Sequence, residues 1–174
     1  VAKAPSYAPS HFSLAGAYYE VKRYDEGIAA IGHYRALAPT DLRGALFLRD
    51  MLYAKGEYRA VAELTREMTR LEPGNAQRFL EAGAMYEELR LLDSAAVVFR
   101  GGIVLHETSD DLQFRLGVVS RQLGRTREAE EAFRRVIQLN PSSTGAYVLL
   151  GTLYAETGRG SEAIAVLEAG LTME

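Results

Sequence analysis

Apolar residues recur along this chain at the spacing of amphipathic helices, in pairs of stretches separated by short polar turns. A first stripe, at i, i+3, i+4 and i+7, consists of Tyr147, Leu150, Gly151 and Tyr154. After the polar stretch ETGRGSE, a second stripe at helical spacing consists of Ala163, Val166, Leu167 and Leu171. Because such positions share one face of a helix, the pattern predicts two helices joined by a tight turn, which is a helical hairpin.

The hairpin pattern recurs every 34 residues. Counted back from Gly151 at this interval, the chain holds Gly117, Gly83, Arg49 and Ala15. Three prolines obey the same interval without any inserted residue: Pro39, Pro73 and Pro141. A constant period of this size is typical of stacked repeats, because one unit cannot bury its apolar face alone. The sequence therefore predicts five consecutive hairpins.

Small residues mark special positions in these hairpins. Gly158 falls at the end of a predicted first helix, where a left-handed backbone favours a residue without Cβ. Glycine or alanine on the predicted helices would let two helix axes approach closely, and this set comprises Ala15, Gly83, Gly117, Gly151, Ala95, Ala129 and Ala163. Gly101 and Gly102 lie inside a second helix, where we expect them to allow close packing.

The repeated unit resembles the tetratricopeptide repeat, which reads W-x2-L-G-x2-Y, then A-x3-F, then P. The best copies are Tyr147-x2-Leu150-Gly151-x2-Tyr154 with Ala163-x3-Leu167, and Phe79-x2-Ala82-Gly83-x2-Tyr86 with Ala95-x3-Phe99. The resemblance implies an all-α fold: a right-handed α-superhelix, or solenoid, of five antiparallel helix hairpins. We expect one domain of a larger protein, with a lead-in at 1–7 and repeats at 8–41, 42–75, 76–109, 110–143 and 144–174.

Two units depart from the family pattern. In the degenerate second unit, Arg49 takes the small-residue position and Thr65 stands where a large apolar residue is expected. These residues make close packing of the two helices of the second unit doubtful, and they would allow these helices to separate locally. The fourth unit has Ser120 where an aromatic residue is usual.

The resemblance also implies that first helices line a concave wall, the usual binding surface of the family. Beside each core stripe runs another at i, i+4 and i+7, which supplies the candidate partner-binding residues: Phe12, Tyr19, Leu46, Asp50, Tyr53, Leu80, Glu87, Phe114, Val118, Arg121 and Val148. Aromatic and aliphatic anchors with mixed charge suit an extended peptide or a partner's helix. For Phe12, Leu46 and Phe114, packing between adjacent hairpins is an equally good interpretation.

Charge and composition narrow the function classes. The formal net charge is −3, so we expect no nucleic-acid binding, which needs a clustered positive surface. The arginines between 115 and 135 lie among Glu128, Glu130 and Glu131, which predicts a mutually neutralising helix face. The chain has no run of eighteen apolar residues, so we expect no direct membrane insertion. The 17 arginines against 3 lysines indicate a bacterial source, and the absence of cysteine permits either cytoplasm or periplasm.

Catalytic chemistry finds little support in the sequence. His11, His33 and His106 are scattered, and His106-Glu107 lacks the second histidine of a helical zinc motif. No glycine-rich phosphate loop with its lysine is present, and Gly158-Arg-Gly160 falls in a turn between helices. We therefore expect no enzyme, no cofactor and no metal.

These observations predict a non-catalytic scaffold, in a soluble compartment of a bacterium, that binds a peptide or partner-protein segment in the concave groove. Two alternatives stay open. One is the periplasmic repeat region of an exopolysaccharide-export or envelope-assembly protein, and the other is the targeting arm of an enzyme whose catalytic domain is absent. The last hairpin leaves Val166, Leu167 and Leu171 partly bare, so the terminal hairpins offer a surface for further repeats or self-association.

Overall fold

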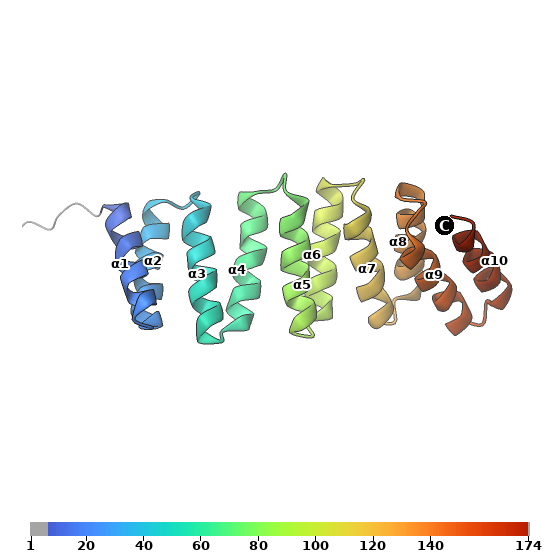
Figure 1. The fold of residues 1–174 in the computed structure, drawn as a ribbon, viewed down its shortest axis with the longest axis horizontal. Coiled ribbons are helices and arrows are strands. Elements are labelled where there is room, and N and C mark those ends of the chain that lie inside the picture. The colour runs from blue at the N-terminus through green and yellow to red at the C-terminus, as the bar shows by residue number, and fades with distance from the viewer. Residues whose placement is uncertain (1–6, 174) are drawn as a thin grey trace, which may run out of the picture. The chain divides into compact units, whose positions relative to one another are not determined.

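The computed structural model describes residues 7–173, and these residues contain helices and turns but no β-strand (Figure 1). The chain divides into two compact units, Val1–Glu72 and Pro73–Glu174. None of the described helices is long and apolar enough to cross a membrane. The expectation of an all-α fold is confirmed.

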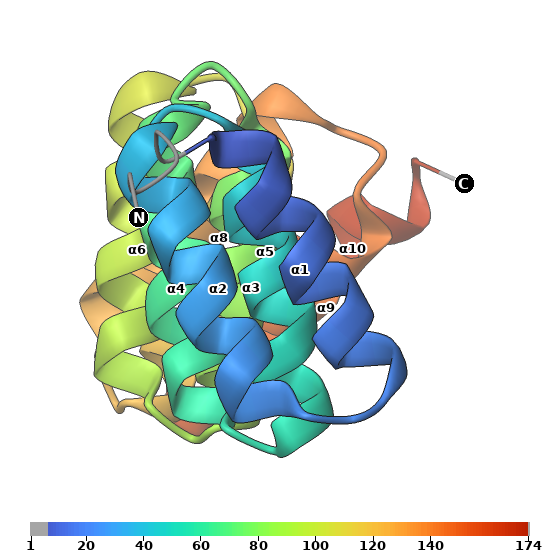
Figure 2. The same cartoon turned by 90° about the vertical axis from the view of Figure 1, so that its left-hand side faces the viewer.

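Unit 1 consists of two helix pairs, α1 with α2 and α3 with α4. Their bounds are α1 Ala8–Glu20, α2 Tyr24–Leu37, α3 Leu42–Lys55 and α4 Tyr58–Leu71. The helix α3 also packs against α2, so each helix contacts the next along the chain. Figure 2 shows α1 and α2 in front of α3 and α4.

Unit 2 repeats the same arrangement three times. Its helices are α5 Ala76–Glu88, α6 Leu92–Leu105, α7 Asp110–Gln122, α8 Thr126–Leu139, α9 Thr144–Glu156 and α10 Gly160–Leu171. Consecutive helices pack together, and α7 additionally contacts both α5 and α9. We call the odd-numbered helices first helices and the even-numbered ones second helices. The first helices of unit 2 thus lie side by side.

The turn inside each hairpin has one residue with a left-handed backbone, and these residues recur at the 34-residue period. The backbone angle φ is +84° at Gly56, +71° at Gly124 and +75° at Gly158, which confirms the expectation for Gly158. The equivalent positions in the first and third hairpins hold Lys22 and Arg90, with φ of 61° and 58°. The packing of the two helices therefore imposes this turn even where a side chain makes it less favourable.

Glycines on the first helices let second-helix side chains reach the backbone. A Cβ atom built at Gly83 would lie 2.1 Å from the ring of Phe99, and one at Gly117 would lie 2.6 Å from that of Phe133. Gly151 faces Leu167 in the same way. The predicted close approach is confirmed at these three positions, where any side chain would overlap a buried neighbour.

The adjacent glycines of α6 differ from each other. A Cβ at Gly102 would lie 2.8 Å from that of Phe79, so Gly102 allows close packing as expected. The expectation for Gly101 is wrong, because nothing lies within 4 Å of its position. The helix turns Gly101 toward solvent while its neighbour faces the core.

The irregular residues of the second and fourth repeats are accommodated by hydrogen bonds. Thr65 is buried, and its hydroxyl donates to the carbonyl of Val61 over 2.8 Å, so the core accepts this polar side chain. Arg49 is half-buried and pairs with Asp50 at 3.0 Å. Ser120 is also buried, and its hydroxyl donates to Glu128, which Arg100 holds through two hydrogen bonds. In place of an aromatic ring, the fourth repeat therefore has a polar network.

Candidate functional site

Two candidate residues of unit 1, Phe12 and Tyr19 of α1, join an aromatic cluster with α3. The rings of Phe12 and Tyr19 lie 5.3 and 5.6 Å from that of Phe47, a residue that the sequence interpretation missed. Phe12 also meets Tyr34 edge-on at 5.0 Å. Phe12 and Tyr19 are half-buried against the core of the unit. For Phe12, the packing interpretation therefore fits the structure better than a role as a free anchor.

Three further candidates lie on α3. Tyr53 is 58% exposed and stacks edge-on with Tyr58 of α4 at 5.3 Å. Leu46 is half-buried, and Asp50 is exposed and paired with Arg49. Tyr53 is thus the aromatic anchor that stays accessible in unit 1.

In unit 2 the apolar candidates come from three adjacent first helices. Leu80 on α5, Val118 on α7 and Val148 on α9 are partly or largely exposed. Phe114 is half-buried, its ring lies 6.1 Å from that of Phe133, and it borders Gly145 of α9. Phe114 therefore packs between hairpins, and Val118 packs against the core cluster formed by α8, α9 and α10. Leu80 is half-buried, and Val148, at 48%, is the most exposed of these four residues. We call the side of α5, α7 and α9 that carries Leu80, Val118 and Val148 the first-helix face.

Charged candidates on the first-helix face are paired with neighbouring helices. Arg121 donates to both carboxylate oxygens of Glu156 on α9, and this hydrogen bond lowers the pKa of Glu156. Glu87 on α5 has Arg115 of α7 at 3.7 Å, but its buried Oε2 atom accepts no hydrogen bond. Burial raises the pKa of the Glu87 carboxyl, and the Arg115 charge opposes that rise. The mixed charge predicted for this surface is largely compensated inside the chain.

Replacing Glu87 with glutamine should make the chain less sensitive to pH. Because the pKa of Glu87 is raised in the folded state, the native chain binds more protons than the unfolded one, so wild-type stability falls as pH rises through that pKa. The variant lacks this loss, so near neutral pH its free energy of unfolding should exceed that of the wild type by roughly 1 kcal/mol or less. At pH values below the ordinary pKa range of carboxyl groups, the two proteins should be equally stable. Urea denaturation across this pH range measures the difference. Glu88→Gln, at the exposed neighbour, is the matched control, and an equal response there would contradict the assignment.

Four of the six arginines between 115 and 135 form ion pairs, but three of the four pair with carboxylates on other helices and only one with a glutamate nearby in sequence. Besides the two pairs above, Arg125 pairs with Asp93 of α6 and Arg134 with Glu130 of its own helix. Glu128 instead binds Arg100 of α6. Except for Arg134–Glu130, these ion pairs link neighbouring hairpins, and each neutralises the arginine that forms it.

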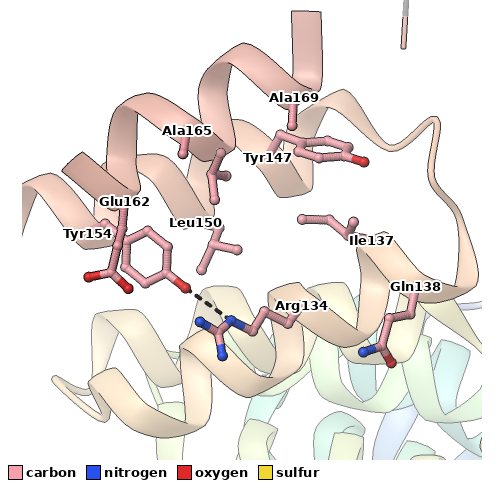
Figure 3. A pocket seen from close by; sticks show the side chains of 10 residues that line it. Arg134, Ile137, Gln138, Tyr147, Leu150, Tyr154, Glu162, Ala165 and Ala169 are labelled. Atoms are coloured by element: carbon pink, nitrogen blue, oxygen red, sulfur yellow. Dashed lines mark hydrogen bonds between the residues drawn. The ribbon is translucent and has the colours of Figure 1, made fainter. Parts of the chain in front are cut away.

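A pocket of about 500 Å³ opens between α8, α9 and α10. Figure 3 shows Ile137 and Leu150 projecting toward it, with Ala165 and Ala169 across from them and Arg134 bonded to the Tyr154 hydroxyl over 3.0 Å. The remaining lining residues are Gln138, Tyr147, Glu162 and Val166. The sequence interpretation missed this pocket.

Small side chains on α10 explain why the pocket is open. One repeat earlier, the positions of Ala165 and Ala169 hold Glu131 and Arg135, whose longer side chains would occupy such a space. The pocket lies on a different side of α9 from the first-helix face, because Leu150 and Tyr154 line it whereas Val148 does not. Its apolar walls suit an apolar side chain.

The histidines are not all scattered as predicted. His11 of α1 and His33 of α2 lie with ring centroids 5.2 Å apart, because these two helices pack together. His106 is separate and contacts the Pro73 carbonyl through Nε2 at 2.9 Å. Among residues 7–173, no group of three or more potential ligand side chains is placed to hold a metal.

Residues 120–172 match the tetratricopeptide-repeat family model. This segment is a tetratricopeptide-repeat region. The matched segment covers the last hairpin and most of the one before it, and the hairpin arrangement continues through the rest of the described residues. The resemblance in sequence is therefore confirmed.

Solved structures share this fold at low identity. MamA is 20% identical with a TM-score of 0.69, and the match covers 96% of this chain and 91% of MamA. YrrB, described as a TPR protein with an unusual peptide-binding site, is 17% identical with a TM-score of 0.68, over 97% of this chain and 87% of YrrB. MamA from Desulfovibrio magneticus RS-1 is 13% identical with a TM-score of 0.65, over 99% and 97%. Identities this low establish the repeat fold alone.

Two curated relatives are much longer than this chain. Protein O-mannosyl-transferase TMTC1 of Homo sapiens is 24% identical over 164 residues, which are 92% of this chain and 19% of the transferase. A pentatricopeptide repeat-containing protein of Arabidopsis thaliana is 51% identical over 43 residues, which are 25% of this chain and 8% of that protein. The matched residues of this chain thus correspond to a minor part of each relative.

Proposed function

We propose that this chain is a non-catalytic interaction scaffold that binds a peptide or a partner-protein segment on its first helices. The observation that carries the proposal is the first-helix face, where three adjacent helices carry half-buried Leu80 and Val118 and the 48% exposed Val148. In unit 2, the repeats at 76–109, 110–143 and 144–174 would each contribute a first helix to the binding surface.

The energetics of the first-helix face support an apolar partner segment. Arg121 is already bound to Glu156, and Arg115 lies beside Glu87. A partner that covers this surface would therefore bury few charged groups without an ion-pair partner. The burial of exposed apolar side chains would then supply most of the affinity. The peptide-binding site named for YrrB supports the same use of this fold. We place the scaffold in the cytoplasm or periplasm of a bacterium, which the excess of arginine over lysine favours.

A peptide-display library panned against the chain tests this function. We expect selected peptides whose binding is weakened about 10-fold or more when Leu80 and Val148 are both replaced by glutamine, a loss of about 1.4 kcal/mol or more. The matched control replaces Val97 and Val104, two exposed valines of the second helix α6, by glutamine. Equal losses in both variants, or no selected peptides at all, would contradict the proposal.

The match to TMTC1 favours a second candidate, in which the repeats are the targeting arm of a transferase. In this case the first-helix face would hold the polypeptide that the enzyme modifies. Sequencing the adjoining coding region separates the candidates. A neighbouring transferase domain would support the targeting arm, and a neighbouring β-barrel or membrane span would favour envelope export.

A further inference from the structure

Ion pairs join the second helices of neighbouring repeats at two junctions. In unit 1, Arg35 of α2 binds Glu67 of α4 at 2.8 Å. In unit 2, Arg100 of α6 binds Glu128 of α8 at 2.6 Å, and Ser120 of the intervening α7 donates to the same carboxylate over 2.8 Å. Each pair therefore links two second helices across the first helix that lies between them in the chain.

The junction between α8 and α10 has apolar residues at the positions of the first bridge. Ile137 and Ala169 lie three repeat lengths after Arg35 and Glu67. Both of them line the pocket of about 500 Å³ between α8, α9 and α10. The exchange of an ion pair for two apolar side chains removes a link between the second helices and leaves apolar surface in its place. The pocket is thus a consequence of the residues at this junction.

The residues of the second bridge are kept at this junction but have other partners. Arg134 and Glu162 lie one repeat length after the bridging pair of α6 and α8. Tyr154 takes the place of Ser120, and its hydroxyl accepts a hydrogen bond from Arg134 over 3.0 Å (Figure 3). Glu162 binds Arg159 at the start of α10. Arg134 and Glu162 therefore lie at the pocket without closing it.

The pocket uses a different side of α10 from the one that a following repeat would cover. Phe133 and Ile137 of α8 pack in the cluster with α9, and their equivalents on α10 are Leu167 and Leu171. A first helix that followed α10 would pack on these two leucines, as α9 packs on α8. The pocket is lined instead by four other residues of α10: Glu162, Ala165, Val166 and Ala169. Its opening therefore does not depend on a cover over the leucines.

The charged groups around the pocket neutralise one another. Glu130 binds both Arg134 and Arg159, and Arg159 also binds Glu162. These two cations and two carboxylates have no net charge, so they do not compensate the burial of a charged ligand. The other walls are mainly apolar: Ile137, Tyr147, Leu150, Ala165, Val166 and Ala169. An uncharged apolar group therefore fits this pocket better than an ion.

Gln138 adds an amide group to the pocket lining. Its side chain is exposed, and its oxygen accepts a hydrogen bond from Arg135 over 3.2 Å. Neither N–H group of the amide has an acceptor among residues 7–173. A backbone carbonyl beside an inserted side chain could accept from this amide, whereas a hydrocarbon could not. The amide therefore favours a polypeptide as the occupant.

We propose that the pocket receives one large apolar side chain, such as leucine, methionine or phenylalanine, from a partner polypeptide. The amide of Gln138 donates to the partner's backbone beside that side chain. The volume of about 500 Å³ lies within the range of small-ligand sites. The pocket lies on a different side of α9 from the first-helix face, so it is a second contact site that does not require the first.

Titration of the 174-residue chain with blocked amino acids, followed by nuclear magnetic resonance, tests the proposal. The probes are N-acetyl-L-leucinamide and N-acetyl-L-phenylalaninamide, which carry one apolar side chain between two backbone amides. We expect saturable chemical-shift changes at Ile137, Leu150 and Val166, with a dissociation constant on the order of 1 mM. N-acetyl-L-serinamide is the polar control and should cause no such changes.

Three variants locate the binding site. Ala165→Glu combined with Ala169→Arg introduces the residue types that the preceding repeat carries at exposed positions, and it should weaken probe binding about 10-fold or more. Gln138→Ala should weaken it about 2- to 10-fold, the effect of one hydrogen bond. The same variant should bind toluene as the wild type does, because toluene has no backbone. Val148→Gln, on the first-helix face, should bind the probes like the wild type.

Three outcomes would overturn the proposal. The first is the absence of shift changes in the wild-type chain at about ten times the expected dissociation constant. The second is unchanged binding by the Ala165→Glu, Ala169→Arg variant, shown to be folded by circular dichroism, which would place the probes elsewhere. The third is equal affinity for toluene and N-acetyl-L-phenylalaninamide together with no effect of Gln138→Ala, which would assign the pocket to a small apolar molecule.

Discussion

Replacing Phe133 with alanine is expected to lower the free energy of unfolding of unit 2 by about 3–5 kcal/mol. The ring is completely buried and packs against the backbone of α7 at Gly117. It also joins the apolar cluster with Leu150 and Tyr154 of α9. Its loss would leave a cavity where three helices meet, and the surrounding helices can collapse into it only partly.

Urea denaturation with hydrogen exchange of the α7–α9 amides measures this loss locally. The local measurement matters because repeat arrays need not unfold in one step. Phe114→Ala is the control, since its ring is only half-buried and should cost less. A Phe133→Ala loss below about 1 kcal/mol, typical of an average substitution, would contradict the packing described here.

Replacing Gly83 with alanine should destabilise unit 2 by about 1–3 kcal/mol, although alanine normally stabilises a helix. The added methyl group would lie 2.1 Å from the Phe99 ring, which is completely buried and cannot move aside without disturbing α6. The overlap therefore outweighs the gain in helix propensity. Thermal unfolding followed by circular dichroism measures the net change.

Gly101→Ala is the matched control and should stabilise the chain by up to about 1 kcal/mol, because its position in α6 is open. A double variant identifies the cause of the Gly83 effect. Combined with Phe99→Leu, Gly83→Ala should cost less than the sum of the two single losses, because the smaller side chain relieves the overlap. Additive losses would show that the Phe99 ring is not what excludes the methyl group.

The candidate site was predictable only in part, because the helical pattern assigns a face but not its neighbours. The stripe at i, i+4 and i+7 named Leu80, Val118 and Val148, which are half-buried or exposed beside the core, and their binding role stays a prediction. The same rule selected Phe12 and Phe114, whose rings turn toward the adjacent hairpin. Phe47 lay outside the stripe, and only the approach of α1 to α3 shows its role.

Charge pairing was also beyond the sequence pattern. Nearby positions suggested that Glu128 neutralises the local arginines, but the structure pairs it with Arg100 and Ser120. The environment of Glu87 was equally hidden from the sequence pattern. Its Oε2 atom is buried without a hydrogen bond, in the region where α7 packs against α5. Arg100 and Glu128 lie 28 residues apart and on different hairpins, as do Glu87 and Arg115, so the helix pattern of a single repeat does not reveal these pairs.

The sequence by itself determined the helical hairpins, because the period of apolar positions, the turn glycine Gly158 and the small residues facing Phe99 and Phe133 are local requirements of one repeated unit. Only the tertiary structure decided which surfaces remain open. The pocket beside Leu150 depends on three helices, and the partial burial of Phe12 depends on the approach of α3 to α1. Periodicity records which side of a helix is apolar, whereas packing determines whether another element covers that side.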